Sequence, residues 1–508
     1  MNRYLGIELG STRIKAVVID ENYVPVSKGD YSWKSTYENG VWTYDLSEAV
    51  WGIKQALLQV EDRENISAVG ISGMMHGYLA FDKDWNLLTP FRTWQNTMTA
   101  QAANTLTNLF GFNIPQRWSI AHLFQAVLNR EPHVERIAHI TTLAGYIHYL
   151  LTGVNAVGIG EASGIFPIDS KKLDYDEAML SKFASLEIIR ELPWRITDIL
   201  PQVLPAGADG GCLTSDGAAL MDQMLTPGIP FAPPEGDAGT GMVATNAVKP
   251  RTGNISAGTS IFFMVVLEKP LANVYEQIDV VTTPAGKPVA MVHCNNCTTD
   301  MNAWISVFKE AAVLFGADPE NTDWYTKLHK ETLKADLDCG GILTCNYLAG
   351  EGVTGFDAGR PMVMRTPGSN FTLANLFRSM LYSSMATLRL GMDILAQERV
   401  AIDCLIGHGG LFKTEDVAQR YMAAACSAPI ACMQTAAEGG PYGMALLAAY
   451  RMEKQQDEPL EFYLSNRVFA LANATVCQPD SGVQAGFNHY LKGFCELLKV
   501  ERKAIDVL

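Results

Sequence analysis

Two β-hairpins with the same kind of tip constrain the fold of this chain more than any other feature. The first spans residues 3–20, with an apolar strand, the turn Gly10-Ser-Thr-Arg13 and a returning strand rich in β-branched residues. The second lies at 254–262 and turns at Ala257-Gly-Thr-Ser260. Each tip combines glycine with hydroxyl side chains, so its N–H and hydroxyl groups can hold an anion, most often phosphate. The pattern predicts two halves that each present a phosphate-gripping tip.

A single carboxylate, Asp237, lies in the glycine-dense stretch 233–242 just before the second hairpin. Glycines let a backbone come close to a bulky ligand and adopt positive φ. The stretch therefore predicts a turn that presents a general base to a bound molecule. A surface turn, in which the aspartate serves only turn chemistry, explains the same residues.

Length and charge narrow the class of protein. At 508 residues the chain is too long for one core, and about two to four domains are expected. A net charge of −15 argues against nucleic acid and anionic membranes as partners. It leaves room for a small anion held with Mg²⁺. The sequence contains no run of about 18 apolar residues, so we expect no membrane-spanning helix. The N-terminus does not resemble a signal peptide, and we therefore expect a cytoplasmic protein.

The ten cysteines are scattered, and only Cys294 and Cys297 are closely spaced. A second CxxC pair that would complete a zinc site is missing. We therefore expect reduced thiols in a cytoplasmic protein. A redox or metal role for this pair is the less favoured alternative.

Two segments of the first half carry residues suited to a sugar. A buried-type strand at 66–72 opens into Gly73-Met-Met-His-Gly77, and open α/β sheets place ligands at such strand ends. Trp94 and Asn96 lie on the loop that follows, and an aromatic ring with an amide is a common way to hold a sugar. A structural histidine and a packed tryptophan are the corresponding alternatives.

Helical periodicity predicts the main helices. The expected helices lie at about 46–60, in two segments within 119–153, at 299–316, at 372–397 and from 441 to 450. The segment Gly158–Phe166 is polar and glycine-rich between apolar flanks.

Taken together, these pieces resemble the FGGY carbohydrate kinases, and within them the xylulokinase-like branch. The matches run in family order over nearly the whole chain: Gly6-Ile-Glu-Leu-Gly-Ser-Thr12, Gly73–Gly77, Tyr146–Gly153, Ala162-Ser-Gly164, Gly236-Asp237 with Gly239, Ser256–Ser260, Leu348–Glu351 and Gly407–Gly410. Each motif is weak alone, but eight in register are specific.

The resemblance implies an α/β fold of two actin-like (ribonuclease-H-like) ATPase domains with a central cleft. Residues 1–245 would form the N-terminal domain, which binds the sugar and carries the base. Residues 246–508 would form the C-terminal, nucleotide-binding domain with a C-terminal helical extension. Mg²⁺ and ATP would be bound, and a terminal sugar hydroxyl phosphorylated.

The resemblance also assigns roles to individual residues. Asp237 would be the catalytic base. The sugar would be held by Met75, His76, Trp94, Asn96, Asp237, Asn295 and Asn296. The nucleotide would be held by Gly10, Ser11, Thr12, Lys15, Gly258, Thr259, Ser260, Gly409, Gly410 and Phe412. Glu8 and Asp237 would lie at the metal.

The sequence departs from the family pattern in three places. Glu8 stands where the family usually has Asp, which can reshape the Mg²⁺ site. Asn96 and Met98 replace an Asp and an Arg near the sugar, so a charged pair is lost there. The segment His293–Cys297 is also unlike the common pattern and could shape a branch-specific pocket.

The function favoured by the sequence is an ATP-dependent sugar kinase with xylulose as the best guess. Alternative acceptors are ribulose, fuculose, rhamnulose, gluconate or a polyol. An actin-fold ATPase or sugar sensor that phosphorylates nothing is a rival from another class, although a sensor needs no base. The expected partner is a small sugar, without nucleic acid or membrane, and a homodimer is one option for assembly.

Overall fold

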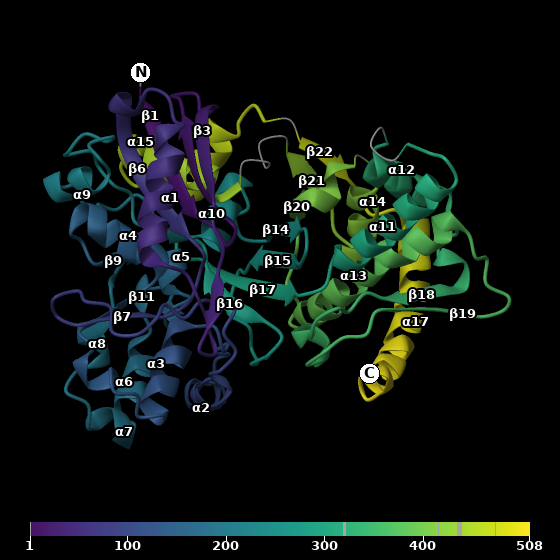
Figure 1. The fold of residues 1–508 in the computed structure, drawn as a ribbon, viewed down its shortest axis with the longest axis horizontal. Coiled ribbons are helices and arrows are strands. Elements are labelled where there is room, and N and C mark those ends of the chain that lie inside the picture. Colours follow the sequence, from purple (N-terminus) through teal and green to yellow (C-terminus); the bar gives the residue numbers. More distant parts are fainter. Residues whose placement is uncertain (1, 319–321, 415, 434–438, 473, 508) are drawn as a thin grey trace. The chain divides into compact units, whose positions relative to one another are not determined.

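The computed structural model describes residues 2–318, 322–414, 416–433, 439–472 and 474–507. The chain forms two compact units, coloured along the sequence in Figure 1. The first unit comprises Met1–Lys249, Asn273–Val289 and Glu438–Ala472, and the second comprises Pro250–Ala272, Ala290–Ala437 and Asn473–Leu508. The predicted division at 245/246 treats each domain as one continuous segment, whereas these units interleave. That functional division stays a prediction.

A five-stranded mixed sheet forms the centre of the first unit, in the order β13-β6-β1-β2-β3. Its strands are β1 (Arg3–Leu9), β2 (Arg13–Ile19), β3 (Pro25–Ser32), β6 (Ile66–Gly73) and β13 (Glu235–Gly236). β1 pairs antiparallel with β2 and parallel with β6, and β13 pairs parallel with β6. The predicted N-terminal hairpin is therefore confirmed.

Alternation along β1 separates the two faces of this sheet. Leu5, Ile7 and Leu9 belong to a core that includes the buried face of α1 (Leu46–Leu58). Gly6 and Glu8 face the opposite way, toward α15 (Gly439–Glu453). α1 begins as its sequence predicts, because the Asp45 side chain accepts a hydrogen bond from the Ser47 N–H.

Further helices and short strands complete the first unit. The helices are α2 (Ala100–Phe110), α3 (Ser119–Leu128), α4 (Leu143–Thr152), α5 (Ile159–Ala162), α6 (Glu177–Ala184), α7 (Glu187–Arg190), α8 (Ile196–Ile199), α9 (Ser215–Leu220), α10 (Asp237–Ala244) and α16 (Leu460–Tyr463). The strands are β4 (Thr36–Glu38), β5 (Val41–Thr43), β7 (Leu79–Phe81), β8 (His139–Thr141), β9 (Ala156–Gly158), β10 (Ile168–Asp169), β11 (Asp174–Tyr175), β12 (Gln202–Leu204) and β16 (Asp279–Thr282).

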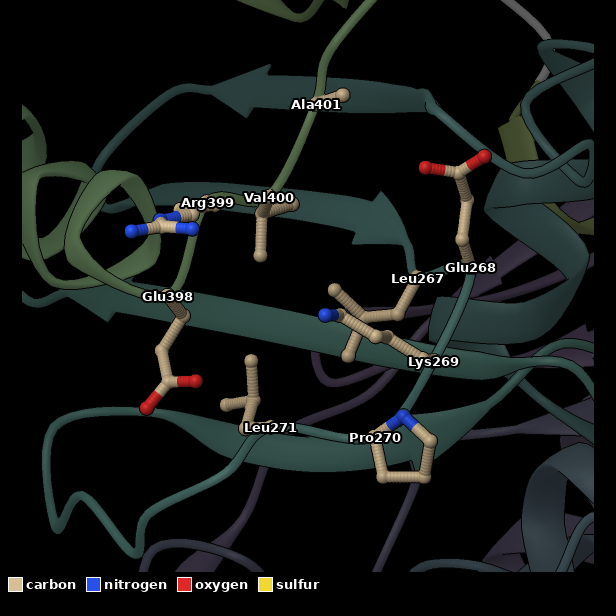
Figure 2. Close-up of a pocket in the computed structure, with 9 residues that line it drawn as sticks. All are labelled: Leu267, Glu268, Lys269, Pro270, Leu271, Glu398, Arg399, Val400 and Ala401. Carbon is tan, nitrogen blue, oxygen red and sulfur yellow. The ribbon is translucent and has the colours of Figure 1, made fainter.

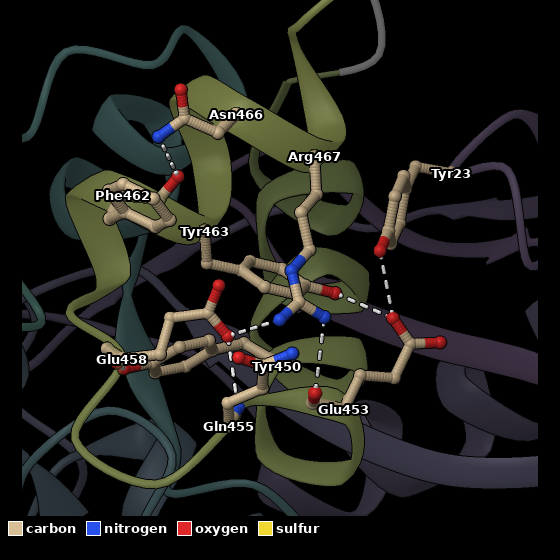
Figure 3. A network of polar contacts seen from close by, with 9 residues as sticks. All are labelled: Tyr23, Tyr450, Glu453, Gln455, Glu458, Phe462, Tyr463, Asn466 and Arg467. Carbon is tan, nitrogen blue, oxygen red and sulfur yellow. Dashed lines mark hydrogen bonds and ion pairs between the residues drawn. The ribbon is translucent and has the colours of Figure 1, made fainter.

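α15 lies beside β1 although more than 400 residues separate them in sequence (Figure 1). The two backbones touch, because a Cβ on Gly6 would lie 2.0 Å from the Pro441 carbonyl oxygen. At the far end of α15 the Glu453 carboxylate accepts hydrogen bonds from the hydroxyls of Tyr4 (2.6 Å), Tyr23 (2.8 Å) and Tyr463 (3.0 Å), and Figure 3 shows the last two. These contacts dock segment 439–472 on the N-terminal sheet.

The second unit contains a mixed sheet in which β17-β15-β14-β20-β21-β22 follow one another. Its strands and those of a separate two-stranded sheet are β14 (Thr252–Ala257), β15 (Ile261–Val266), β17 (Pro288–Cys294), β18 (Ile342–Cys345), β19 (Met362–Arg365), β20 (Cys404–His408), β21 (Ile430–Met433) and β22 (Ala474–Cys477). Its helices are α11 (Thr299–Leu314), α12 (Trp324–Glu331), α13 (Leu373–Gln397), α14 (Ala418–Cys426) and α17 (Ser481–Ile505). β14 and β15 form the second predicted hairpin, which is therefore confirmed.

The stretch around Asp237 differs from the prediction. The sequence predicts a turn through 233–242, but α10 begins at Asp237 itself. Gly239 and Gly241 within α10 lower its helix propensity. Burial of Met242, Val243 and Ala244, together with close packing on α15, overrides that preference.

Among the described residues, every helix is too short or too polar to span a membrane.

Candidate active site

Asp237 is held at the junction of a strand and a helix. β13 ends at Gly236, beside the carboxyl end of β6, and Asp237 is the first residue of α10. Its Oδ1 accepts hydrogen bonds from the N–H groups of Met75 (3.2 Å) and Ala238 (2.9 Å). Burial raises the pKa of Asp237, and these N–H donors oppose the rise. The carboxylate is thus fixed and partly buried, and its affinity for a proton is raised.

The Met75–His76 loop at the end of β6 lies next to this carboxylate. His76 is buried, has φ 72°, and its Nδ1 lies 3.4 Å from the Gly164 carbonyl oxygen. Its ring stacks on Trp118 with centroids 6.0 Å apart. A non-glycine residue with positive φ is strained and needs surrounding structure to hold it. The structure therefore brings Met75, His76 and Asp237 together, as the sequence predicts.

Trp94 and Asn96 differ in what they contact. Trp94 Nε1 donates a 3.3 Å hydrogen bond to Ser11 Oγ, which joins a predicted sugar residue to a predicted phosphate residue. Asn96 is buried, and its amide exchanges hydrogen bonds of 2.8 and 2.9 Å with the Trp42 backbone. Asn96 also donates to the Thr93 carbonyl. Its side chain therefore braces the loop against β5.

Aromatic side chains fix the tip of the first hairpin. The turn closes through a 3.0 Å hydrogen bond from Gly10 N–H to the Arg13 carbonyl. Trp33 Nε1 donates to the Gly10 carbonyl at 2.7 Å, and the Tyr44 hydroxyl donates to the Ser11 carbonyl at 2.7 Å. These hydrogen bonds engage the Gly10 and Ser11 carbonyls and hold the turn in one conformation.

Glu8 pairs across the hairpin with Lys15, on the sheet face that α15 covers. A Cβ on Gly440 would lie 1.9 Å from its Oε1, so only glycine fits there. Burial raises the pKa of Glu8 to about 7; Lys15 opposes this rise and Asp237 adds to it. The negative charge of Asp237 thus disfavours ionisation of Glu8. Among the described residues, no group of three or more histidines, cysteines or acidic residues could hold a metal ion.

Sequence reasoning missed two further buried carboxylates beside Asp237, those of Glu161 and Glu235. Both residues are almost fully buried, and burial raises the pKa of Glu235 to about 8 despite three backbone N–H donors. Burial also raises the pKa of Glu161 well above its ordinary value; the Thr142 hydroxyl opposes this, and the Glu235 and Asp237 carboxylates add to it. A Cβ on Gly236 would lie 2.4 Å from Glu161 Oε2. The only sequence signal was the pair of glycines at 158 and 160, which leave space for a neighbouring side chain.

In the second unit, two predicted nucleotide loops meet at one edge of the sheet. β14 and β20 run parallel, with Ser256 paired to His408, so the turns that follow them are adjacent. A Cβ on Gly409 would lie 2.4 Å from the Ala257 carbonyl oxygen, and Gly409 has φ 97°. Phe412 packs over Gly407. The Cβ positions of Gly258 and Gly410 point into open space, which a ligand could occupy.

Asn295 and Asn296 lie in the loop after β17, where the Glu351 carboxylate organises the backbone. Glu351 Oε2 accepts from the N–H groups of Asn295 (2.9 Å) and Asn296 (3.3 Å) and from the Asn296 amide (3.1 Å). The Asn296 oxygen accepts from the N–H groups of Leu348 and Ala349. Asn296 thus ties two loops together, whereas Asn295 is exposed and donates to the Gly350 carbonyl at 2.7 Å.

Cys294 and Cys297 are free, buried thiols. Burial raises the pKa of Cys297 to about 12 and that of Cys294 well above its ordinary value. A reactive or metal-binding cysteine needs a lowered pKa, so these thiols have the character of structural residues.

The second unit also contains a small pocket that the predicted site residues do not line. It is lined by residues 267–271 and 398–401, which Figure 2 shows as sticks.

Comparison with known proteins places this geometry in a family. The N-terminal domain model of the FGGY family of carbohydrate kinases matches residues 3–244, and the C-terminal domain model matches residues 253–452. The chain is 24% identical to a xylulose kinase of Haemophilus influenzae, over 78% of this chain and 80% of that protein.

Solved structures agree in fold. A ligand-bound xylulose kinase from Lactobacillus acidophilus has a TM-score of 0.80 at 15% identity, with 98% of each chain covered. A gluconate kinase from the same organism has a TM-score of 0.78 at 17% identity, again with 98% of each chain covered. The two mixed-sheet domains thus have the actin-like ATPase fold, and the chain belongs to the FGGY family of carbohydrate kinases.

Proposed function

We propose that this carbohydrate kinase transfers the γ-phosphoryl group of ATP to a terminal hydroxyl of a small neutral sugar, with xylulose as the first candidate. The observation that carries the proposal is the fixed, partly buried Asp237 carboxylate beside Met75 and His76. Xylulose is favoured because a xylulose kinase of Haemophilus influenzae is similar to this chain over 78% of its length.

Asp237 is the general base in this proposal. Its carboxylate accepts the proton of the sugar hydroxyl, whose oxygen attacks the γ-phosphorus. The new O–P bond forms as the bond from the γ-phosphorus to the bridging oxygen breaks, and ADP leaves with that electron pair. Phosphoryl transfer depends mainly on positioning and charge stabilisation. A positioned base is typically worth about 10²–10⁴-fold in rate.

The remaining predicted residues hold the reactants. In the first unit Met75, His76 and Trp94 would contact the sugar, and Gly10, Ser11, Thr12 and Lys15 the phosphates. In the second unit Gly258, Thr259, Ser260, Gly409, Gly410 and Phe412 would hold the nucleotide. Asn96, Asn295 and Asn296 complete the proposed substrate set, with Asn96 and Asn296 acting through the loops that they brace.

Glu8 and Asp237 fit a magnesium ion. Mg²⁺ bound with nucleotide phosphates usually takes only one or two carboxylates from the protein. Burial and the negative charge of Asp237 disfavour the ionised form of Glu8, as its raised pKa shows. A bound cation would offset that cost by stabilising the ionised carboxylate. When bound, Mg²⁺ would neutralise phosphate charge.

Local charge favours a neutral acceptor over an acidic one such as gluconate. The Asp237 carboxylate lies beside the Met75–His76 loop, whereas burial raises the pKa of Glu161 and Glu235 so far that neither adds a full negative charge at pH 7. The nearby cation Arg117 is already paired with Asp279. A carboxylate on the substrate would therefore be repelled by the Asp237 carboxylate, and Arg117 would not be available to pair with it.

A coupled ADP-release assay over pentuloses, hexuloses, polyols and gluconate tests the proposal. We expect release that depends on a neutral sugar, and Asp237→Asn should retain ATP binding while kcat falls by roughly 10²-fold or more. Asp216→Asn, an exposed carboxylate in α9, is the matched control. Release without any sugar would favour an actin-fold ATPase, and wild-type turnover in Asp237→Asn would end the assignment of the base.

A further inference from the structure

A buried carboxylate joins the strand that leads into Asp237 to a neighbouring helix. Glu235 lies on β13, two residues before Asp237, and is 1% exposed. Its Oε1 accepts from Gly160 N–H at 3.2 Å and its Oε2 from Glu161 N–H at 2.9 Å. The Pro234 carbonyl accepts from Gly158 N–H at 2.6 Å. Three hydrogen bonds therefore fasten residues 234–235 to the start of α5.

Glycines make room for this carboxylate. A Cβ on Gly158 would lie 2.3 Å from Glu235 Oε1, and a Cβ on Gly160 would lie 2.4 Å from Oε2. On the other side, a Cβ on Gly239 in the first turn of α10 would lie 3.5 Å from Oε2. The carboxylate thus fills the space between the beginnings of two helices, and one of these helices starts with Asp237.

The position of Asp237 therefore has two independent supports. On one side, β13 pairs with β6, Gly236 lies opposite Gly73, and Met75 N–H binds the Asp237 carboxylate. On the other side, only the Gly236 peptide separates Asp237 from the residue fastened to α5. Loss of the second support would leave the carboxylate anchored through β6 and through the packing of α10 on α15.

We propose that Glu235 is a positioning residue, which holds the backbone of Asp237 in the geometry needed to accept the substrate proton. This inference rests on the proposed function, because it assumes that Asp237 is the base. It assigns to Glu235 no contact with sugar or nucleotide. Its effect should therefore appear in kcat and leave the KM values for both substrates nearly unchanged.

Two kinds of substitution test this role. Glu235→Gln keeps the shape of the side chain and one hydrogen-bond acceptor, and kcat should fall about tenfold. Glu235→Ala removes both acceptors. In that variant kcat should fall about 10²-fold, as expected for a catalytic group displaced by about 1 Å. Gly160→Ala pushes on the carboxylate without changing it and should reproduce the kcat loss. Gly241→Ala is the matched control, because a Cβ there meets no atom within 4 Å.

A double-variant cycle separates positioning from general stability. In the Asp237→Asn background, Glu235→Gln should cause no further loss of kcat, because its effect acts through the base. Melting temperatures measured on the same four proteins report the structural effect separately. An undiminished tenfold loss in the Asp237→Asn background would overturn the inference, and so would wild-type kcat in both Glu235→Gln and Gly160→Ala. Absence of sugar-dependent ADP release from the wild-type protein would instead refute the proposed function.

Discussion

The contact between α10 and α15 gives a prediction whose size follows from the structure. Gly443 of α15 faces the backbone of α10, and a Cβ at this position would lie 2.0 Å from the Thr240 carbonyl oxygen and 3.1 Å from Ala244 N. Gly443→Ala places a methyl group there. Neither obstacle can move by a change of rotamer, because both are backbone atoms of one helix.

The substitution should destabilise the protein strongly for a single methyl group. Real Cβ contacts essentially never fall below 3.0 Å, so the two helices must separate locally by about 1 Å. Overpacking against a rigid backbone costs about 3 kcal/mol, the upper part of the usual range. For a large domain this corresponds to a fall of roughly 6–12 °C in melting temperature. Because α10 begins with Asp237, kcat should also fall, by about tenfold.

Thermal unfolding followed by calorimetry, with steady-state ADP release, measures both effects. Gly241→Ala in the same helix is the control: its Cβ meets no atom within 4 Å, and alanine gains up to about 1 kcal/mol of helix propensity over glycine. That variant should melt at or above the wild-type temperature. If Gly443→Ala melted within about 2 °C of the wild type, the close approach of the two helices would be wrong.

Two other predictions concern stability. Burial lowers the pKa of His122 from 6.5 to about 3, so below pH 6.5 the unfolded chain binds a proton that the folded chain does not, and the free energy of unfolding decreases by about 1.4 kcal/mol for each unit by which the pH is lowered. Between about pH 7.5 and pH 5 the melting temperature of His122→Phe should therefore decrease less than that of the wild type. An equal decrease in both proteins would contradict this prediction. Glu453→Gln leaves one amide oxygen for the hydroxyls of Tyr4, Tyr23 and Tyr463, so unfolding free energy in denaturant titrations should fall by about 1–3 kcal/mol with kcat unchanged. A variant as stable as the wild type would show that this network contributes nothing.

The helices and strands whose formation depends mainly on residues adjacent in sequence could be predicted from the sequence. The two hairpins were read correctly because alternating apolar residues flank a compact glycine and hydroxyl turn. α1 and α13 were predicted because apolar residues recur in each one with the period of a helix. The helix at Asp237 was missed, since three glycines in a short segment indicate a turn and only packing on α15 reverses that preference.

The place of segment 439–472 could not be predicted for a similar reason. α15 is buried over most of its length, so it shows no amphipathic stripe to indicate which sheet it covers. What selects its partner is close backbone contact, Gly6 against Pro441 and Gly443 against Thr240. Such complementarity is a property of two distant segments together.

The residues of the candidate site also differ in whether a local sequence signal marks them. Met75 and His76 could be proposed from the sequence because they follow the end of a predicted strand, where α/β sheets place ligands, and Asp237 because it is the one carboxylate in a glycine-dense stretch. Glu235 could not, because a glutamate beside a glycine-rich segment shows its role only when the folded chain places it over Gly158 and Gly160. The amide of Asn96, which the sequence predicts at the sugar, is engaged by the Trp42 backbone, and its role at the sugar stays a prediction.

Three segments far apart in sequence fix the position of Asp237: the end of β6 through Met75 N–H, the start of α5 through Glu235, and α15 through the contact of Gly443 with Thr240. Two of these contacts require glycine on one side, because a Cβ would force the backbones apart. The abundance of glycine around the proposed base therefore has a cause beyond turn formation. It lets a short helix approach its neighbours closely enough that backbone atoms, which have no rotamers, define where the carboxylate lies. A base held in this way is already ordered before the sugar arrives, so little conformational entropy is lost when the proton is transferred.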